Sequence, residues 1–292
     1  MSAHASTLFC FGFGYSARAL AARLGPGFAV RGTGRDPTSP HLLPFGPGKA
    51  FDDAWLEGVT HLLISIPPDA EGDPVLRAAG ESLARRARQF AWAGYLSTTG
   101  VYGDHGGGKV DENTPLHPSP GRSAWRASAE AGWGDLHQRC GLPVHVFRLA
   151  GIYGPGRNAL EKVLAGAASR IDKPGHLFSR IHVEDIAAVL AASIARPNPG
   201  AIYNVCDDEP ASSADVTAFA ARLLGLPPPP LIKLEDAALS EMAQSFYRDS
   251  RRVDNRRIRR ELGVQLAYPT YREGLRALLG TLDGRAAPPE AG

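Results

Sequence analysis

Near the N-terminus the chain reads Thr7-Leu8-Phe9-Cys10-Phe11-Gly12-Phe13-Gly14-Tyr15-Ser16-Ala17-Arg18-Ala19-Leu20. An apolar run leads into a Gly-x-Gly-x-x-Ala pattern and then an Ala-, Leu- and Arg-rich run, which predicts a strand, a tight turn and a helix. Gly12 lets the chain turn sharply, Gly14 lets backbone N–H groups approach a phosphate, and Ala17 lets the helix lie close to the strand. Because a helix N-terminus attracts anions, the turn predicts a dinucleotide pyrophosphate site, and the alternative is an ordinary strand–helix turn. The residues that it would contribute are Gly12, Gly14, Tyr15, Ser16 and Ala17.

A second apolar run, at residues 28–35, predicts the strand whose end faces the adenosine ribose. At that place an acidic residue bonds the 2′-hydroxyl of NAD, whereas an arginine accommodates the 2′-phosphate of NADP. The tip here carries Thr33, Gly34 and Arg35, and Asp36 comes one step later. We therefore expect NADP in preference to NAD, with Arg35 as the clamp; the alternative is a solvated loop arginine.

Composition narrows the class of protein. The 292 residues are 43% hydrophobic and 21% charged, as in ordinary globular proteins, and the net charge of +2 gives no reason to expect nucleic acid or a membrane as a partner. Three cysteines, Cys10, Cys140 and Cys206, lie far apart in apolar segments and predict buried free thiols. No ligand spacing predicts a metal. The sequence shows neither a signal peptide nor a membrane span, so we expect a cytoplasmic protein.

Strand-like and helix-like runs alternate along the chain, which predicts a doubly wound parallel sheet. The expected strands beyond the first two are at 59–68, 90–99, 142–149 and 201–206, with loops at 37–48 and 103–121. The expected helices are at 15–24, 74–91, 123–138, 158–169, a segment ending near 196, 212–225, 235–244, 254–262 and 270–281. We expect a Rossmann domain at 1–155, to which 177–206 returns, a smaller and mainly helical substrate lobe at 156–176 and 207–284, and a flexible tail at 285–292.

Polar residues follow two of the expected strands at their carboxyl ends, where ligands bind in such sheets. Ser65, Ile66 and Pro67 would lie beside the cofactor, as would Ser97. The adjacent hydroxyls of Ser97, Thr98 and Thr99 can bond a substrate oxygen, or they can satisfy the backbone of their own loop.

Five motifs in order resemble the extended short-chain dehydrogenase/reductase family, and within it the NAD-dependent epimerase/dehydratase group. They are Gly12-x-Gly14-x-x-Ala17, Ser97-Thr98-Thr99-Gly100-Val101-Tyr102-Gly103, Arg148-Leu-Ala-Gly-Ile-Tyr153-Gly-Pro-Gly, Ile181-His182-Val183-Glu184-Asp185-Ile186-Ala187 and Tyr203-Asn204-Val205. The resemblance implies an NAD(P)-binding domain, a smaller substrate lobe, and hydride transfer, often on a sugar nucleotide. It also implies a Ser or Thr that binds the reacting oxygen, and a Tyr-x-x-x-Lys pair in which Tyr is the acid/base.

The chain departs from this pattern, because it contains no Tyr-x-x-x-Lys. The family's Ser/Thr place is taken by Thr98, with Thr99 as its neighbour, while Arg122 stands at the Tyr place and Arg126 at the Lys place. Arginine stays protonated, so Arg122 cannot shuttle a proton. Arg126 can still donate to ribose hydroxyls or to an anionic substrate.

Three other residues are candidates for the acid/base: Tyr102, Tyr153 and His182, although the resemblance assigns them mostly structural roles. Asp185 is expected to cap its helix or anchor a loop. The residues expected on the substrate side are Tyr153, Arg157, Arg180 and His182.

Two functions remain open at this stage. One is an NAD(P)-dependent oxidoreductase or epimerase-like enzyme with a non-standard acid/base, acting on a small anionic or nucleotide-sugar-like substrate. The other is a catalytically silent NADP-binding regulator or sensor. The resemblance also implies a possible homodimer through the helices at 74–91 and 123–138.

Overall fold

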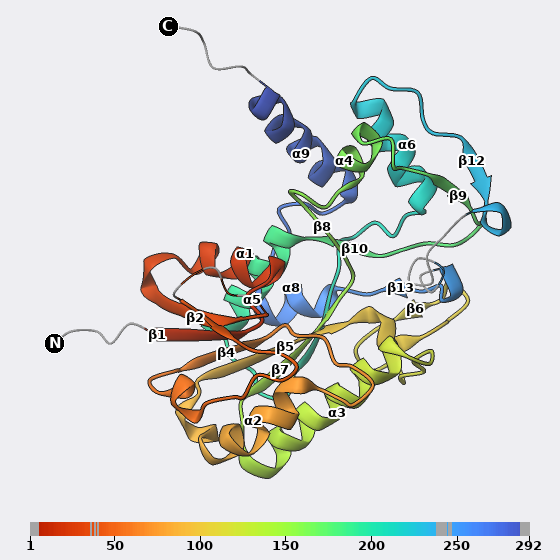
Figure 1. Ribbon diagram of the computed structural model, residues 1–292. Helices are drawn as coiled ribbons and strands as arrows, with labels where there is room; N and C mark the ends of the chain where they lie inside the picture. The colour runs from red at the N-terminus through yellow and green to blue at the C-terminus, as the bar shows by residue number, and fades with distance from the viewer. Residues whose placement is uncertain are drawn as a thin grey trace, which may run out of the picture.

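The centre of the fold is a seven-stranded, all-parallel sheet, seen in a computed structural model that describes residues 6–35, 37, 39, 41–237, 244 and 247–286 (Figure 1). The strand order is β11-β7-β5-β4-β1-β2-β3. In chain order these strands are β1 (Ser6–Phe11), β2 (Phe28–Gly34), β3 (Leu42–Pro44), β4 (His61–Ile64), β5 (Trp92–Thr98), β7 (Val144–Leu149) and β11 (Ile202–Val205). The central strands β4, β5 and β7 are buried almost throughout, as continuous apolar runs predict for a sheet covered on both faces. The predicted doubly wound fold is therefore confirmed.

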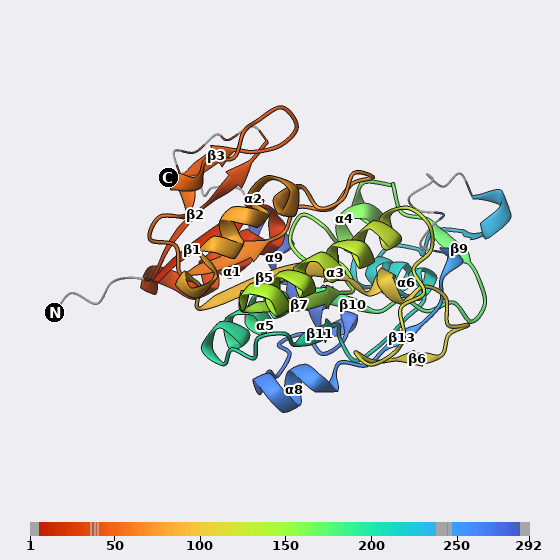
Figure 2. The ribbon, with the colours of Figure 1, turned by 90° about the horizontal axis from the view of Figure 1, so that it is seen from below.

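Helices cover both faces of this sheet (Figures 1 and 2). One layer holds α1 (Tyr15–Leu24), α5 (Val183–Ala195) and α8 (Arg256–Leu262), and the other holds α2 (Pro74–Arg85) and α3 (Arg122–Cys140). Each layer seals its own apolar core against the strands. At the first core, Trp92 on β5 donates its indole N–H to Ser193 on α5 at 3.0 Å, so this buried donor is paired.

A smaller lobe lies beside the carboxyl edge of the sheet (Figure 1). It contains α4 (Ala159–Leu164), α6 (Ser213–Leu223) and α9 (Tyr271–Ala286), with a short parallel pair of β9 (Arg170–Asp172) and β12 (Leu231–Lys233). These helices share a third apolar core around Leu160, Phe219 and Leu275. Two more short parallel pairs join distant segments: β8 (Gly151–Tyr153) with β10 (Arg180–His182), and β6 (Lys109–Val110) with β13 (Arg252–Val253).

Several boundaries differ from the expectations. The stretches at 37–48 and 103–121 are not wholly loop, because they contain β3 and β6. Strand β3 lies at the sheet edge, where proline is tolerated. Helix α9 runs to Ala286, beyond the expected start of the flexible tail at 285, and residues 287–292 lie outside the described part of the chain. Of the helix expected at 235–244, residues 234–236 form a short 3-10 turn and 238–243 are not described.

Two smaller findings bear on composition. All three cysteines are free, as predicted; Cys10 and Cys206 are also buried as expected, whereas Cys140, at the end of α3, is only half-buried. Among the described residues, no helix has both the length and the apolar character needed to cross a membrane.

Candidate functional site

The glycine-rich turn leaves the carboxyl end of β1 in a conformation that requires glycine. Gly12 has a φ of 89°, and a Cβ there would lie 2.7 Å from Ser65 Oγ and 2.9 Å from Ile66 Cγ1. The turn is held from both neighbouring strands. The Gly12 N–H donates to Thr33 Oγ1 at 2.9 Å, and Ser65 Oγ donates to the Gly12 carbonyl at 2.6 Å. Thr33 and Ser65, expected as cofactor contacts, thus act at least as braces of the turn.

The second glycine of the turn faces open space. No heavy atom lies within 4 Å of the position of a Gly14 Cβ, and Gly14 caps α1 without any side-chain hydrogen bond. The first N–H groups of α1 are therefore available to an anion. Ala17 is fully buried and Ser16 nearly so, while Tyr15 OH donates to the Pro155 carbonyl at 2.8 Å and ties the turn to the loop above it. These residues fit a dinucleotide pyrophosphate.

Basic residues lie on and beside β2, and the Arg31 guanidinium donates to the Glu57 carbonyl at 2.8 Å. Arg35 is exposed just beyond the strand, and Arg18, Arg31 and His41 help to line a pocket of about 470 Å³ beside the turn. Sequence reasoning missed these three residues. The signal for Arg18 was present, because it stands in the first turn of the helix that follows the glycines.

A buried polar network lies behind the end of β5. Arg148 on β7 and Glu130 on α3 form an ion pair with Nη2–Oε2 at 2.8 Å, with side chains 3% and 7% exposed. Ser97 Oγ donates to the same carboxylate. Arg148 Nη1 also donates to Tyr102 OH at 2.9 Å, and that hydroxyl donates to Asn204 Oδ1 at 2.7 Å.

This network argues against two expected roles. Tyr102 is fully buried, its hydroxyl is bonded on both sides, and burial raises its pKa, although the Arg148 guanidinium opposes that shift. It is a structural anchor and does not fit the role of acid/base. Ser97 directs its hydroxyl into the network as well, which argues against a direct cofactor contact. Arg148 stood in one of the sequence motifs without an assigned role, and Glu130 was not singled out by the sequence.

The remaining polar groups at this edge surround the start of α3. Thr98 Oγ1 accepts from the Gly100 N–H at 3.1 Å and so begins a short 3-10 helix, Thr99–Tyr102. Ser123 Oγ lies 3.1 Å from the position of a Gly100 Cβ, and Thr98 Oγ1 lies 3.3 Å from the same point. Two hydroxyls therefore border one small space, and Ser123 was not among the expected site residues.

The two arginines at the Tyr and Lys places differ. Arg122 is the exposed first residue of α3. Arg126 is half-buried, and its Nη1 donates to the Leu96 carbonyl at 2.6 Å and to Tyr95 OH at 3.3 Å. Arg126 is thus bonded to β5, and at least one of its N–H groups serves the scaffold.

The other two acid/base candidates are packed inside. Tyr153 OH lies against α9, where a Gly274 Cβ would approach it to 2.1 Å, and burial raises the Tyr153 pKa. His182 is 1% exposed, and its Nδ1 accepts from the Glu184 N–H at 3.3 Å as the cap of α5. Burial lowers the His182 pKa and so disfavours the charged ring. Both placements argue against proton transfer to a substrate.

On the lobe side, Asp185 anchors a loop, and the two arginines expected near the substrate differ in their exposure. Asp185 accepts from the Ala267 and Tyr268 N–H groups at 2.7 and 3.1 Å, which confirms its role as a loop anchor. Arg157 is exposed, whereas Arg180 is half-buried and its Nη1 donates to the Phe178 and Ala211 carbonyls.

Near the loop after β5, Arg251 donates to the Gly103 carbonyl at 2.8 Å and adds a second guanidinium on this side. No cluster of metal-ligating side chains occurs among the described residues.

Comparisons with known proteins bear on the family and the fold. The model of the NAD dependent epimerase/dehydratase family matches residues 81–206. Over 241 residues the chain is 33% identical to Protein YeeZ of Escherichia coli (strain K12), covering 78% of this chain and 80% of that protein. Over 251 residues it is 30% identical to a 3-diazoavenalumate denitrifying reductase of a Streptomyces species, covering 77% and 81%. A solved structure of a functionally unknown conserved protein from Silicibacter pomeroyi is 54% identical, with a TM-score of 0.89 and coverage of 94% and 99%.

Two more distant structures share the fold. A dTDP-glucose 4,6-dehydratase from Bacillus anthracis, solved in complex with NAD, is 17% identical with a TM-score of 0.74 and coverage of 96% and 97%. The human epimerase family protein SDR39U1, solved with NADPH, is 17% identical with a TM-score of 0.73 and coverage of 94% and 99%. The ordered motifs, the parallel sheet, the glycine turn and the relatives at 30% identity and above lead to one conclusion: the chain belongs to the NAD-dependent epimerase/dehydratase family, a branch of the extended short-chain dehydrogenases/reductases.

Proposed function

We propose that the protein is an NADPH-dependent reductase that acts on a small anionic substrate held between the carboxyl edge of the sheet and the smaller lobe. The observation that carries the proposal is the turn at Gly12 and Gly14. A Cβ on its first glycine would collide with Ser65 and Ile66. Its second glycine leaves the N-terminus of α1 without a side-chain cap and facing open space. A pyrophosphate fits there because the N–H groups and the helix dipole both favour an anion. The cofactor, when bound, supplies the hydride.

NADP is favoured over NAD by the charges beside the turn. Arg35 lies beyond the tip of β2, and Arg18, Arg31 and His41 surround the neighbouring pocket. Guanidinium groups form charge-assisted hydrogen bonds with a phosphate, and NAD has no 2′-phosphate to receive them.

On the substrate side, Thr98 and Ser123 offer two hydroxyls to a reacting oxygen, and Arg180 brings positive charge to the lobe side. The guanidinium of Arg251 lies nearby but is paired with Asp249 at 3.6 Å. Reduction is favoured over epimerisation because the Streptomyces relative is a reductase. The proton would have to come from a group other than a Tyr-x-x-x-Lys pair, because the sequence contains none.

A regulator or sensor without turnover is the second candidate, and a specific observation favours it. Tyr102, Tyr153 and His182 are all packed or bonded in structural roles. An NADP-binding protein that does no chemistry has no need of a free acid/base.

The test begins with fluorescence titrations of NADPH and NADH into the purified full chain. NADPH should bind more tightly. Oxidation of NADPH is then followed with a panel of ketones, aldehydes, nucleotide-sugar keto intermediates and an aryl diazonium salt. Turnover of any of them supports the reductase. Binding without turnover across the panel favours the sensor, and a folded protein that binds neither dinucleotide overturns both.

A further inference from the structure

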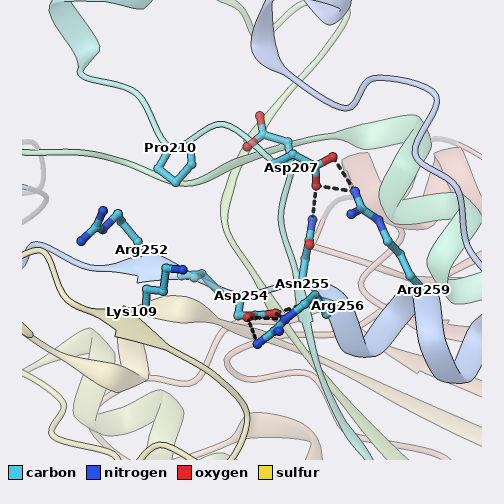
Figure 3. A pocket seen from close by; sticks show the side chains of 10 residues that line it. Lys109, Asp207, Pro210, Arg252, Asp254, Asn255, Arg256 and Arg259 are labelled. Atoms are coloured by element: carbon cyan, nitrogen blue, oxygen red, sulfur yellow. Dashed lines mark hydrogen bonds and ion pairs between the residues drawn. The ribbon is translucent and has the colours of Figure 1, made fainter.

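A second pocket, of about 480 Å³, lies where the end of β11 meets the β6–β13 pair and α8 (Figure 3). It shares no lining residue with the glycine turn. Its charged residues are Lys109, Arg252, Arg256, Arg259, Asp207, Asp208 and Asp254. Nothing in the proposed hydride transfer uses it.

Two cations stand side by side at this pocket. Lys109 and Arg252 are partners in the β6–β13 register, and both are exposed. Like charges opposite each other on neighbouring strands repel, since the strands are only about 4.8 Å apart. Neither side chain makes an ion pair with a carboxylate among the described residues. Arg252 is steadied by donating Nε to the Gly107 carbonyl at 2.8 Å. The pair therefore carries a repulsion that an anion would relieve.

The carboxylates of the pocket are already matched. Asp208 accepts hydrogen bonds from Arg259 and, at 2.7 Å, from Asn255. Asp254 forms an ion pair with Arg256 at 2.7 Å (Figure 3). These carboxylates therefore already have hydrogen-bonded cationic partners, and Lys109 acts on Asp254 only as a nearby charge.

The third acid of the pocket does not offset the charges of Lys109 and Arg252. Asp207 is 2% exposed, and neither of its carboxylate oxygens has a hydrogen-bond partner among the described residues. Burial raises its pKa to about 8, although the charge of Arg180 opposes the shift. Burial therefore disfavours a negative charge on Asp207.

We propose that this pocket binds a compact phosphate-type dianion, either inorganic phosphate or the phosphate group of a small metabolite, between Lys109 and Arg252. The arginine offers a planar fork and the lysine a point charge, which is a suitable pairing for phosphate oxygens. The site stands independently of the proposed reductase activity, because it uses none of the residues of the cofactor turn.

Thermal melting of the full chain in sodium phosphate, against sodium chloride of equal ionic strength, tests the site. A ligand that binds the folded state raises the melting temperature. We expect phosphate-specific stabilisation of the wild type, with and without saturating NADPH. In K109Q/R252Q the phosphate concentration that gives half of the maximal stabilisation should rise at least about tenfold. The matched control is R88Q/K162Q, which removes the same two charge types from exposed positions on other elements and should behave as the wild type.

The variants also report on folding. Without phosphate, K109Q should melt no lower than the wild type, because it relieves the repulsion with Arg252. If K109Q/R252Q does not fold, K109Q alone carries the test. Inorganic phosphate and pyridoxal- or ribose-type phosphate esters, titrated in parallel, distinguish the two ligand sources. The proposal is overturned if phosphate does no more than chloride, if both double variants lose the effect equally, if K109Q/R252Q retains it, or if NADPH abolishes it.

Discussion

The two halves of the candidate site use their polar groups in opposite ways. At the glycine turn, backbone N–H groups at the start of α1 face open space and have no side-chain cap. Around the end of β5, Tyr102 and Arg148 are hydrogen-bonded to other protein groups inside the fold. A hydroxyl already bonded on both sides cannot exchange a proton with a substrate unless those bonds break. The cofactor half is thus preformed for a ligand, whereas much of the other half is scaffold.

The sharpest way to test the cofactor half is to add one methyl group at each glycine. Gly12→Ala would strain a φ of 89° and press against Ser65 and Ile66, so NADPH affinity should fall roughly 100-fold and the melting temperature should drop. Gly14→Ala meets no protein atom, so it should weaken NADPH while leaving the melting temperature unchanged. Fluorescence titration and thermal melting measure both. Normal NADPH binding by Gly14→Ala would mean that the open space is not the phosphate site.

Substitutions in the buried network around the end of β5 should lower the free energy of unfolding. Glu130→Gln leaves the buried Arg148 guanidinium without its counter-charge, which should cost about 3–5 kcal/mol in urea unfolding. The control is Asp135→Asn on the same helix, which breaks the exposed pair with Arg139 and should cost less than about 0.5 kcal/mol. Equal losses in the two variants would contradict the claim that the network supports the end of β5.

Tyr102→Phe separates an anchor from an acid/base. It removes one hydroxyl and leaves Arg148 Nη1 and Asn204 Oδ1 short of a partner, so unfolding free energy should fall by about 1–3 kcal/mol. The folded fraction should keep the wild-type pH profile of NADPH oxidation. A variant that folds normally but loses turnover would restore Tyr102 as the acid/base.

The contrast between the halves also explains what the sequence could predict. The cofactor turn is local, because strand, glycines and helix follow one another within 20 residues, and its pattern identified Gly12, Gly14 and Ala17. Long apolar runs likewise predicted the buried parallel strands. The network is not local: Ser97 meets Glu130 from 33 positions away, and Tyr102 meets Asn204 from 102. No pattern of sequence spacing predicts contacts between residues so far apart.

The short strands could not be predicted from the sequence for the same reason. Strand β6 has two residues, and its partner β13 lies more than 140 positions further along the chain. A run of two residues has no periodicity to detect, so only the tertiary contact creates the strand. The sequence likewise put Tyr102 at the end of a strand, but the direction of its hydroxyl depends on Arg148 and Asn204.

A smaller effect is expected at the adenosine end of the cofactor. Arg35→Asp should weaken NADPH about tenfold and leave NADH nearly unchanged, because only NADPH offers a 2′-phosphate to a guanidinium. Arg18→Asp provides the comparison from the neighbouring pocket. If Arg18→Asp alone discriminates against NADPH, the clamp is Arg18, and if both dinucleotides weaken equally in each variant, neither arginine reads the 2′-phosphate.

The smallest expected effect concerns His182, the one histidine among the acid/base candidates. Burial lowers its pKa in the folded chain, so the unfolded chain takes up a proton first, near pH 6.5, and His182 lowers stability as the pH falls below that value. His182→Asn keeps a capping acceptor for the Glu184 N–H but cannot titrate, so its stability should fall less between pH 8 and pH 5 than that of the wild type.

Urea unfolding at the two pH values measures this difference, and NMR titration of the His182 ring measures its pKa in the folded protein. Loss of the tilted ring contact with Tyr268, whose ring centroid lies 4.0 Å away, should lower the stability of the variant a little at pH 8, where the histidine is neutral in both states. A folded-state pKa at or above 6.5 would mean that the ring is accessible to solvent protons. His182 would then no longer be a purely structural residue and would become the strongest candidate for the missing acid/base.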